Sequence, residues 1–463
     1  MSKGFIPPKP EARADKVSIF THIKLFRKDI FASQPAKLYR AWMAEFRLPF
    51  FKSYFINDPD LVEHVLKKDP DNFPKSEIIK GALYSLLGDS VFVTNGEVWK
   101  RQRRIIDPAF EGGRLRDVFP SMLNAGQAAV ARLDGLADGR AVEVEEQASQ
   151  MAADIIFRTL FSIPITDDVA KQVFDKFREY QRTQPLLNIA SFLKTPNWIP
   201  RLQSKRTRQT SADIRALLTK LTEDRYALIK AGKAPDDLAT KIMTTKDPVT
   251  GKTFTPAEMV DQVAIFFLAG HETSASALAW TLYLLAVDSE VQERVAKEVA
   301  GVEELTFANL SKLRFTRDVF REALRLYPPV PMMIRETLQP EVFRKRQIKV
   351  GSQIVLSPWH IQRHERLWDR PDVFDPDRWK TKETRLCARK AYMPFSAGQR
   401  ACTGAGFAMI EGVLMLAMIL RAFKLEPTGD VPIPVAHLTV RSKDGIYLKF
   451  TKRGSDTTLK QKA

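Results

Sequence analysis

Apolar residues recur with helical spacing over most of the chain. Between a proline-rich N-terminal arm and a polar tail, long stretches place an apolar residue every three or four positions, which predicts α-helices. Short apolar or alternating runs at residues 50–56, 347–356 and 445–450 predict strands. No repeat or Gly/Ser linker divides the chain. We therefore expect one domain over residues 1–463, mainly α with small β-sheets and with loose ends at about 1–15 and 453–463.

The longest predicted helix begins with a capping box. Thr255 and Glu258 stand three positions apart at its start, and apolar character then continues to about Val287. That length is roughly 50 Å at 1.5 Å per residue. Charged residues inside it, such as Asp261 and Glu272, are costly in lipid. The pattern favours a helix buried through the middle of a soluble protein over a membrane span.

Composition and charge narrow the class of protein. The 463 residues are 44% apolar and 27% charged, as in ordinary globular proteins, and include only two cysteines. So few cysteines fit a reducing compartment, and the N-terminus shows neither a signal peptide nor a membrane-length apolar run, which predicts a soluble, cytoplasmic protein. The net charge of +17 suits nucleic acid, anionic lipid or an acidic protein partner. Aromatic residues do not interleave with the charges, so nucleic acid is not expected.

The most informative chemistry surrounds Cys402. Phe395 stands seven positions before it, Gly398 four before, Arg400 two before and Gly404 two after. An apolar run just downstream predicts a helix, which would place the thiol near a helix N-terminus, where its pKa is lowered. If the thiolate is the axial ligand of a haem iron, the glycines permit a tight turn and close approach, Arg400 can bind a propionate and Phe395 can pack beside the loop. A buried structural cysteine is the alternative.

This spacing, F-x-x-G-x-R-x-C-x-G, resembles the haem-binding loop of the cytochrome P450 family. Other family motifs follow in the expected order over roughly residues 50–450. The resemblance implies the cytochrome P450 fold, with haem b buried between the long central helix and the Cys402 loop. Thiolate ligation pushes electron density onto iron and favours O–O cleavage.

A second motif lies in the middle of the long helix. Ala269-Gly270-His271-Glu272-Thr273 resembles the family's oxygen-activation motif, A-G-x-[DE]-T. The resemblance implies that Gly270 removes a side chain where O₂ approaches, that Glu272 relays protons from solvent, and that Thr273 bonds to a carbonyl one turn earlier and holds a water. Ala269 completes this catalytic set, whereas His271 fills the free position and is given no haem role. The alternative is that Glu272 and Thr273 are only polar residues on a buried helix, without a role in catalysis.

Besides Arg400, three further residues are expected to bind the haem propionates, each through a positive charge or an N–H donor. Trp99 and Arg103 match W-x-x-x-R, whose spacing puts both on one helix face. Arg335 matches the family's strand arginine, and Arg400 in the Cys402 loop adds another cation. Several cations around two carboxylates are physically reasonable because buried charges must be paired.

A buried charge triad is expected to specify the fold rather than to act in catalysis. Glu322 and Arg325 match E-x-x-R, and Arg378 matches the arginine of the downstream F-x-P-x-R-[FW] segment. One carboxylate that pairs with two arginines in an apolar interior is expected to specify the fold rather than to take part in the reaction.

The sequence therefore predicts a haem-thiolate mono-oxygenase, and a visible spectrum would separate this function from its alternatives. It would insert one atom of O₂ into a small apolar substrate; a peroxide-driven peroxygenase and a nucleic-acid-binding protein are the alternatives. The expected substrate pocket comprises residues 78–87, 184–192 and 330–333 with Phe266, Ala269, Thr273 and Leu438.

Electrons must come from another protein. The chain has no G-x-G-x-x-G and no cysteine set for an iron–sulfur cluster, which implies a separate acidic ferredoxin or flavodoxin-type donor with its reductase, acting on a monomeric enzyme. Two basic stretches are expected to border the docking face: Lys100, Arg101 and Arg104, and Lys380, Lys382, Arg385, Arg389 and Lys390.

Overall fold

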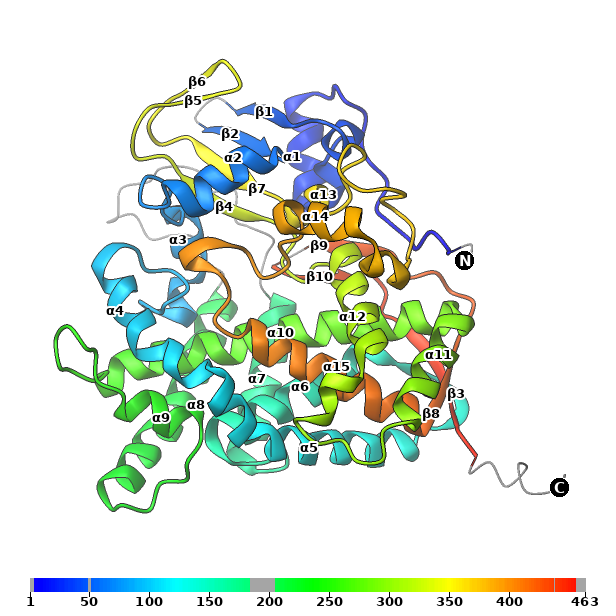
Figure 1. Cartoon of the computed structure of the whole chain (residues 1–463). Coiled ribbons are helices and arrows are strands. Elements are labelled where there is room, and N and C mark those ends of the chain that lie inside the picture. The colour runs from blue at the N-terminus through cyan, green and yellow to red at the C-terminus, as the bar shows by residue number, and fades with distance from the viewer. Residues whose placement is uncertain (1–3, 49–50, 184–204, 437, 455–463) are drawn as a thin grey trace, which may run out of the picture.

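Helices gather around one long central helix, α10 (Pro256–Val287), as Figure 1 shows. The computed structural model describes residues 4–48, 51–183, 205–436 and 438–454. The remaining helices are α1 (Ile19–Lys28), α2 (Pro59–Glu63), α3 (Glu77–Leu87), α4 (Gly96–Ile106), α5 (Gly112–Asp134), α6 (Val144–Phe161), α7 (Asp168–Thr183), α8 (Lys205–Lys230), α9 (Leu238–Thr244), α11 (Ser289–Ala300), α12 (Arg314–Leu326), α13 (Pro358–Ile361), α14 (Lys382–Ala391) and α15 (Ala405–Ala422).

Small sheets flank the helical body. One sheet has the order β1-β2-β7-β4, with β2 and β7 parallel and the other pairs antiparallel. A second has the order β3-β11-β8, and two strand pairs, β5–β6 and β9–β10, complete the set. The strands are β1 (Met43–Leu48), β2 (Phe51–Ile56), β3 (Asp138–Glu143), β4 (Met333–Glu336), β5 (Glu341–Phe343), β6 (Arg346–Ile348), β7 (Gln353–Leu356), β8 (Phe423–Pro427), β9 (Pro434–Ala436), β10 (Val440–Ser442) and β11 (Tyr447–Lys452). The predicted fold class is confirmed.

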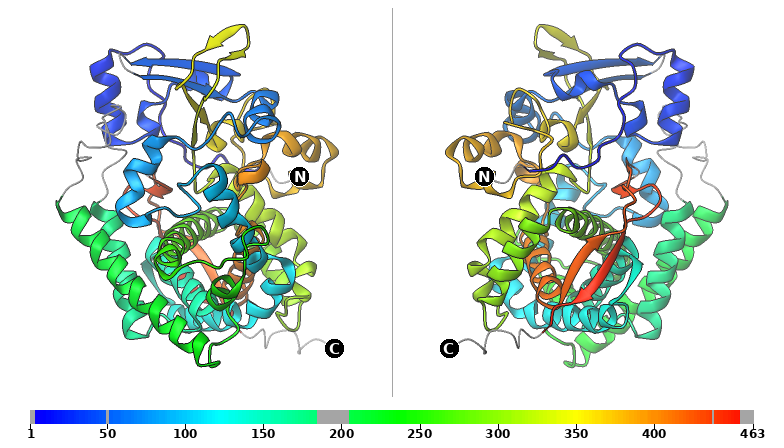
Figure 2. Two further views of the ribbon diagram at one scale, coloured as in Figure 1. Left: turned by 90° about the vertical axis from the view of Figure 1, so that its left-hand side faces the viewer. Right: turned by 90° about the vertical axis from the view of Figure 1, so that its right-hand side faces the viewer.

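Helix α10 begins and ends where the sequence predicts. The Glu258 N–H donates to Thr255 Oγ1 at 3.3 Å, and the Thr255 N–H donates to Glu258 Oε2 at 2.8 Å, which completes the capping box. The helix packs against α3, α6, α8, α12 and α15, and Figure 2 shows it surrounded by other helices when viewed nearly end-on. A helix apolar on all sides is buried in this way because no face can be left to water.

The strand predictions need two corrections. The apolar run at 347–356 is not one strand, because Gly351 adopts φ +76° in a turn that separates β6 from β7. The last strand begins at Tyr447 rather than Gly445, because Gly445 also has a positive φ, +86°. Both glycines lie in turns, and a pattern of apolar residues does not reveal where a turn interrupts a strand.

The N-terminal arm is held against the body rather than loose. The Phe374 N–H donates to Phe5 O at 3.0 Å, and the two rings lie 5.8 Å apart in an edge-on contact. The Tyr327 hydroxyl donates to Pro8 O at 2.6 Å. Residues 5–8 are therefore part of the folded body, which corrects the expectation of a loose arm up to about residue 15.

Helix α15 is the one described helix that is long and apolar enough to cross a membrane. Of its 18 residues, 56% are buried within the protein, where it packs against α5, α10, α11 and α12. Such a helix is ordinary in the core of a large domain, so its composition is weak support for a membrane span.

The predicted charge triad forms in the core. Arg325 donates to Glu322 Oε1 at 2.8 Å, and Arg378 Nε donates to the same oxygen at 2.8 Å. Glu322 and Arg325 are fully buried. The Arg325 guanidinium also donates to the carbonyls of Gln362, Pro371 and Val373, so it joins α12 to a segment about fifty residues further along the chain.

Candidate functional site

The loop before α15 presents Cys402. The Cys402 N–H donates to Phe395 O at 2.8 Å, which folds the loop back on itself. Gly398 has φ +70°, and a Cβ there would overlap the Leu66 carbonyl, so only glycine fits this position. Gly404 has an ordinary φ of −84° and caps α15, which does not require the glycine that the turn argument predicts.

The thiol of Cys402 does not have the low pKa that its place near a helix N-terminus predicts. Its side chain is exposed, yet dense protein around it makes desolvation the largest effect, and the pKa is raised. The Gly404 N–H, Arg103 and Lys75 act in the opposite direction but are outweighed. A bound metal cation would supply the missing compensation, because a coordinating thiol is deprotonated outright.

Four cations gather near this loop. Lys75, Arg103, Arg335 and Arg400 act on one another electrostatically, and Lys75 and Arg103 also act on Cys402. Burial, followed by repulsion from these neighbours, lowers the pKa of Arg400 to about 9 and that of Lys75 well below its usual range. Burial alone lowers the pKa of Arg335 to about 10. Such mutual repulsion favours an anionic ligand.

Some of these donors remain free within the described residues. Arg335 is 4% exposed, and neither its guanidinium nor the Trp99 indole N–H makes a hydrogen bond or ion pair with the described residues. Arg103 already has partners within the protein, because it donates to Ala401 O at 2.8 Å and pairs with Asp107. Arg400 stacks on Trp99 at 4.1 Å and donates to Thr94 O. A ligand with two carboxylates fits this set of donors.

Lys75 belongs to the cluster although sequence reasoning missed it. Its Nζ donates to Phe92 O at 2.5 Å and lies 3.6 Å from the Phe92 ring centroid, and its backbone bridges to Arg335. No motif surrounds Lys75, which reaches the site through its bridge to β4 and through hydrogen bonds with Asn95, a partner of Arg400. No signal in the sequence could have found it.

One face of α10 is open in the middle of the molecule. Between Met259 and Ala286 every residue of α10 is buried except Asp261, Phe266, Ala269, Gly270 and Thr273. The last four share a helix face, and three of them were predicted at the oxygen site. The Thr273 hydroxyl donates to Ala269 O at 2.5 Å, the predicted bond to the preceding turn.

Gly270 has a packing role that the sequence motif does not indicate. A Cβ at this position would overlap the side chain of Ile156 on α6. The glycine therefore allows the close approach of α6 and α10, in addition to the space for oxygen that the sequence motif implies.

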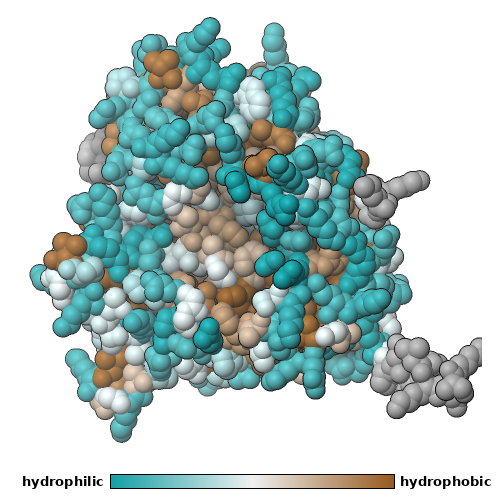
Figure 3. Space-filling model, viewed as in Figure 1, coloured by the Kyte–Doolittle hydropathy of each residue, from teal (hydrophilic) through white to brown (hydrophobic). Residues whose placement is uncertain are grey.

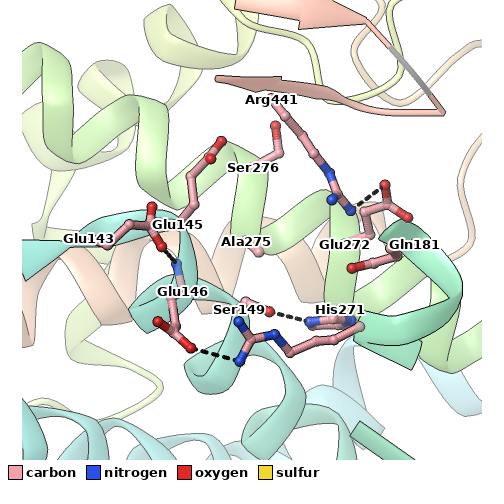
Figure 4. Close-up of a pocket in the computed structure, with 11 residues that line it drawn as sticks. Glu143, Glu145, Glu146, Ser149, Gln181, His271, Glu272, Ala275, Ser276 and Arg441 are labelled. Carbon is pink, nitrogen blue, oxygen red and sulfur yellow. Dashed lines mark hydrogen bonds and ion pairs between the residues drawn. The ribbon is translucent and has the colours of Figure 1, made fainter. Parts of the chain in front are cut away.

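Glu272 points into a polar pocket on another side of α10. The pocket has a volume of about 190 Å³, and Figure 4 shows the side chains of Glu272 and Arg441 in direct contact at one side of it. Glu272 Oε1 accepts from Arg441 Nη2 at 2.8 Å and from the Thr439 hydroxyl at 2.6 Å. Glu272 lines this pocket, although it is itself only 6% exposed. Arg441 and Thr439 come from the C-terminal segment, and sequence reasoning missed both.

His271 lies in the same pocket and away from the open face. Its Nε2 bonds to the Ser149 hydroxyl at 2.6 Å, and its ring packs edge-on against Phe174. Burial, and then repulsion from Arg441 and Arg178, lower its pKa to about 3, so it is neutral. That His271 has no haem role stays a prediction.

The expected substrate pocket is only partly described. Phe266, Ala269 and Thr273 lie on the open face of α10, and Leu438 and Met332 pack against the core. Residues 184–192 lie outside the described residues.

Comparison with known proteins agrees with this geometry. The family model for cytochrome P450 matches residues 13–450. Cyclooctat-9-en-7-ol 5-monooxygenase of Streptomyces melanosporofaciens is 31% identical over 83% of this chain and 83% of its own. The LUTEIN DEFICIENT 5 protein of Arabidopsis thaliana is 29% identical over 96% of this chain and 77% of its own. The crystal structure of the cytochrome P450DA haem domain superposes with a TM-score of 0.81 at 24% identity, covering 97% of this chain and 98% of that one.

Proposed function

Because the chain belongs to the cytochrome P450 family of haem mono-oxygenases, we propose that Cys402 is the thiolate ligand of its haem iron. The observation that carries the proposal is an exposed thiol beside four cations that lack enough carboxylate partners. The other cysteine, Cys387, is half-buried and its thiol donates to Leu367 O, and burial raises its pKa to about 11. Cys387 therefore has the surroundings of an inert structural thiol.

The residues present fit haem b. Trp99, Arg103, Arg335 and Arg400, with Lys75, would hold the two propionates, and Phe395, Gly398 and Gly404 would shape the ligand loop. When bound, the haem supplies the activation of O₂ that inserts one oxygen atom into the substrate. The protein binds and orients the substrate and manages the protons. Of these donors, Arg103 pairs with Asp107, whereas the Arg335 guanidinium makes no ion pair with the described residues.

Proton delivery is assigned to Glu272 and Thr273. Glu272 reaches the outer pocket and Thr273 the open face of α10, so the two adjacent residues span the helix between solvent and the oxygen site. Arg441 and Thr439 hold the carboxylate in its outward position. This pair also favours a mono-oxygenase over a peroxygenase, which needs no such protons.

Replacing Thr273 by Ala should uncouple oxygen consumption from product formation. Removing the hydroxyl leaves the helix and substrate contacts in place but interrupts the proton path, and a positioned acid–base group typically contributes about 10²–10⁴ in rate. Product per NAD(P)H should fall at least about tenfold while peroxide rises. Wild-type coupling in this variant, with Thr281→Ala as the control on the same helix, would contradict the role of Thr273.

The substrate is proposed to be a lipophile. The relatives include a cyclooctat-9-en-7-ol mono-oxygenase and a taurochenodeoxycholic 6 alpha-hydroxylase, both named for apolar ring systems. Phe266 and Ala269 offer an apolar wall on the open face of α10. Fatty acids, terpenoids, carotenoids and steroids should be screened for a low- to high-spin shift of the haem.

The soluble, cytoplasmic location stays a prediction.

An acidic electron donor is proposed to dock on the face that carries the Cys402 loop. Figure 1 shows α4 and α14 on either side of this loop, and Figure 3 shows an apolar hollow ringed by hydrophilic residues on the same face. Arg101 and Arg104 pair with Glu258 and Asp247, so their charges are already compensated. Lys100, Lys380 and Lys390 pair with Glu97, Asp377 and Asp60. Of the two predicted basic stretches, Lys382, Arg385 and Arg389 make no ion pair with the described residues.

Charge reversal on α14 should slow reduction by such a donor. Attraction between charges raises association rates and fades with salt, since screening acts over about 8 Å at physiological ionic strength. Arg385→Glu should lower the second-order reduction rate several-fold at low salt and leave the spin shift unchanged. Lys449→Glu is the control, because Lys449 is exposed on β11 in the separate sheet β3-β11-β8. Rates that respond neither to salt nor to Arg385→Glu would refute docking at this face.

A further inference from the structure

Three side chains with metal-ligating atoms meet where the end of α2 faces β5. Helix α2 continues into a π-helical turn, His64–Lys68, and the Asp69 N–H donates to His64 O at 3.0 Å to close it. Glu341 lies opposite this turn, on β5 (Figure 1). One imidazole nitrogen of His64 and one carboxylate oxygen each of Asp69 and Glu341 lie within 4.8 Å of one another, and all three residues are half-buried.

The imidazole of His64 is held between two buried aromatic rings. Its ring centroid lies 5.6 Å from that of Phe73 and 6.1 Å from that of Phe343, and both contacts are edge-on. This packing leaves His64 Nε2 at 3.5 Å from Glu341 Oε2. Two ligands bound to one tetrahedral zinc ion lie about 3.4 Å apart, so these two atoms already have the spacing of metal ligands.

The Asn72 side chain fixes the carboxylate of Glu341. Asn72 Nδ2 donates to Glu341 Oε1 at 2.6 Å, while Asn72 Oδ1 accepts from the Leu338 N–H at 3.2 Å and the Gln339 N–H at 2.7 Å. One oxygen of Glu341 is therefore held by Asn72, and the other faces His64. Carboxylates that bind metals are commonly oriented by a second hydrogen-bonding residue in this way.

The two carboxylates have no lysine or arginine partner among the described residues. The ion pair of Glu341 is with His64, and the Asp69 carboxylate makes no hydrogen bond or ion pair within the described part of the chain. The two lysines between His64 and Asp69 pair with Glu63 instead. In a chain with a net charge of +17, two adjacent carboxylates without a cationic side chain are a place for a bound cation.

We propose that His64, Asp69 and Glu341 form a binding site for a divalent transition-metal ion of the zinc class. An imidazole beside carboxylate oxygens suits Zn²⁺, whereas Mg²⁺ and Ca²⁺ favour shells made of oxygen alone. Three protein ligands at the surface leave a fourth position to water. The ion would join the end of α2 to β5. This site is separate from Cys402, so the inference does not depend on the proposed haem function.

Calorimetric titration of the haem-loaded, tag-free protein with Zn²⁺ tests the site after treatment with a chelator. Wild type should bind one Zn²⁺ per chain and bind Ca²⁺ far more weakly. His64→Phe keeps a ring between the two aromatic neighbours but removes both nitrogens, and it should abolish this binding. Glu341→Gln should weaken it at least about tenfold, since even residues behind the ligands contribute that much.

Glu63→Gln is the matched control. It removes the same charge as Glu341→Gln from the residue next to His64, and it should bind Zn²⁺ as wild type does. Haem content and the CO spectrum report whether each variant is folded, and Asp69→Asn provides a third ligand variant on a different segment from Glu341. A wild type that binds no Zn²⁺, or that binds Ca²⁺ equally well, would overturn the inference. So would binding that persists in the folded ligand variants.

X-ray absorption at the zinc edge identifies the ligands directly. The bound ion should show nitrogen and oxygen neighbours at about 2.0–2.2 Å and no sulfur at about 2.3 Å. Sulfur in the first shell would place the ion on a cysteine and contradict the site.

Thermal unfolding adds an independent readout. An ion that binds only the folded protein raises its stability, so Zn²⁺ should raise the Tm of wild type and Glu63→Gln but not that of His64→Phe. An equal rise in His64→Phe would show that the stabilising ion binds elsewhere.

Discussion

Cys402→His should abolish the spectrum of thiolate ligation. The reduced, CO-bound protein should lose the absorption band that marks a thiolate ligand and show that of imidazole ligation, because the side chain opposite the CO sets the electron density on iron. Mono-oxygenase activity should fall by several orders of magnitude, since the electron-donating ligand is gone.

The second cysteine provides the control for this experiment. Cys387→Ser alters the half-buried thiol on α14 that donates to Leu367 O. It should leave the CO spectrum and haem content unchanged. A thiolate band that persists in Cys402→His, or one that disappears in Cys387→Ser, would refute the assignment of the ligand.

Glu322→Ala should destabilise the protein by about 3–5 kcal/mol, because removing one partner leaves buried arginines uncompensated. Arg325 is fully buried and Arg378 nearly so, and both donate to the same Glu322 oxygen. The midpoint of urea unfolding should fall sharply, and the ratio of haem to protein should collapse. A loss of this size is a large fraction of the stability of an ordinary domain.

The pH dependence of this triad has a definite sign. Burial by itself would raise the pKa of Glu322, but Arg325 and Arg378 outweigh it and lower the pKa below its usual 4.5. The stabilisation is therefore present above about pH 4.5 and is lost as pH falls toward the folded-state value. Glu383→Ala on exposed α14 is the control and should change stability little. A haem-replete, stable Glu322→Ala protein would contradict the structural role of the triad.

The sequence by itself determined the features that depend on neighbours along the chain. The capping box at Thr255 and Glu258 lies within one turn, so its geometry follows from local hydrogen bonds. The turn at Gly398 and the helix after Cys402 are also local. The E-x-x-R pair needs only the helical period to bring Glu322 and Arg325 together. These features, with the motif order, were sufficient to predict the family and most of the candidate site.

The tertiary structure decided what depends on distant segments and on desolvation. Lys75 joins the cation cluster through β4, and Arg441 reaches Glu272 from a position 169 residues away. A Cβ at Gly270 would overlap a side chain of α6, and desolvation by the surrounding protein raises the pKa of the Cys402 thiol. Glu411 on α15 is only 1% exposed, which its position in the sequence does not indicate. Only packing removes its water and raises its pKa to about 8, because the cost of burying a charge depends on every neighbour in space and not on spacing along the chain.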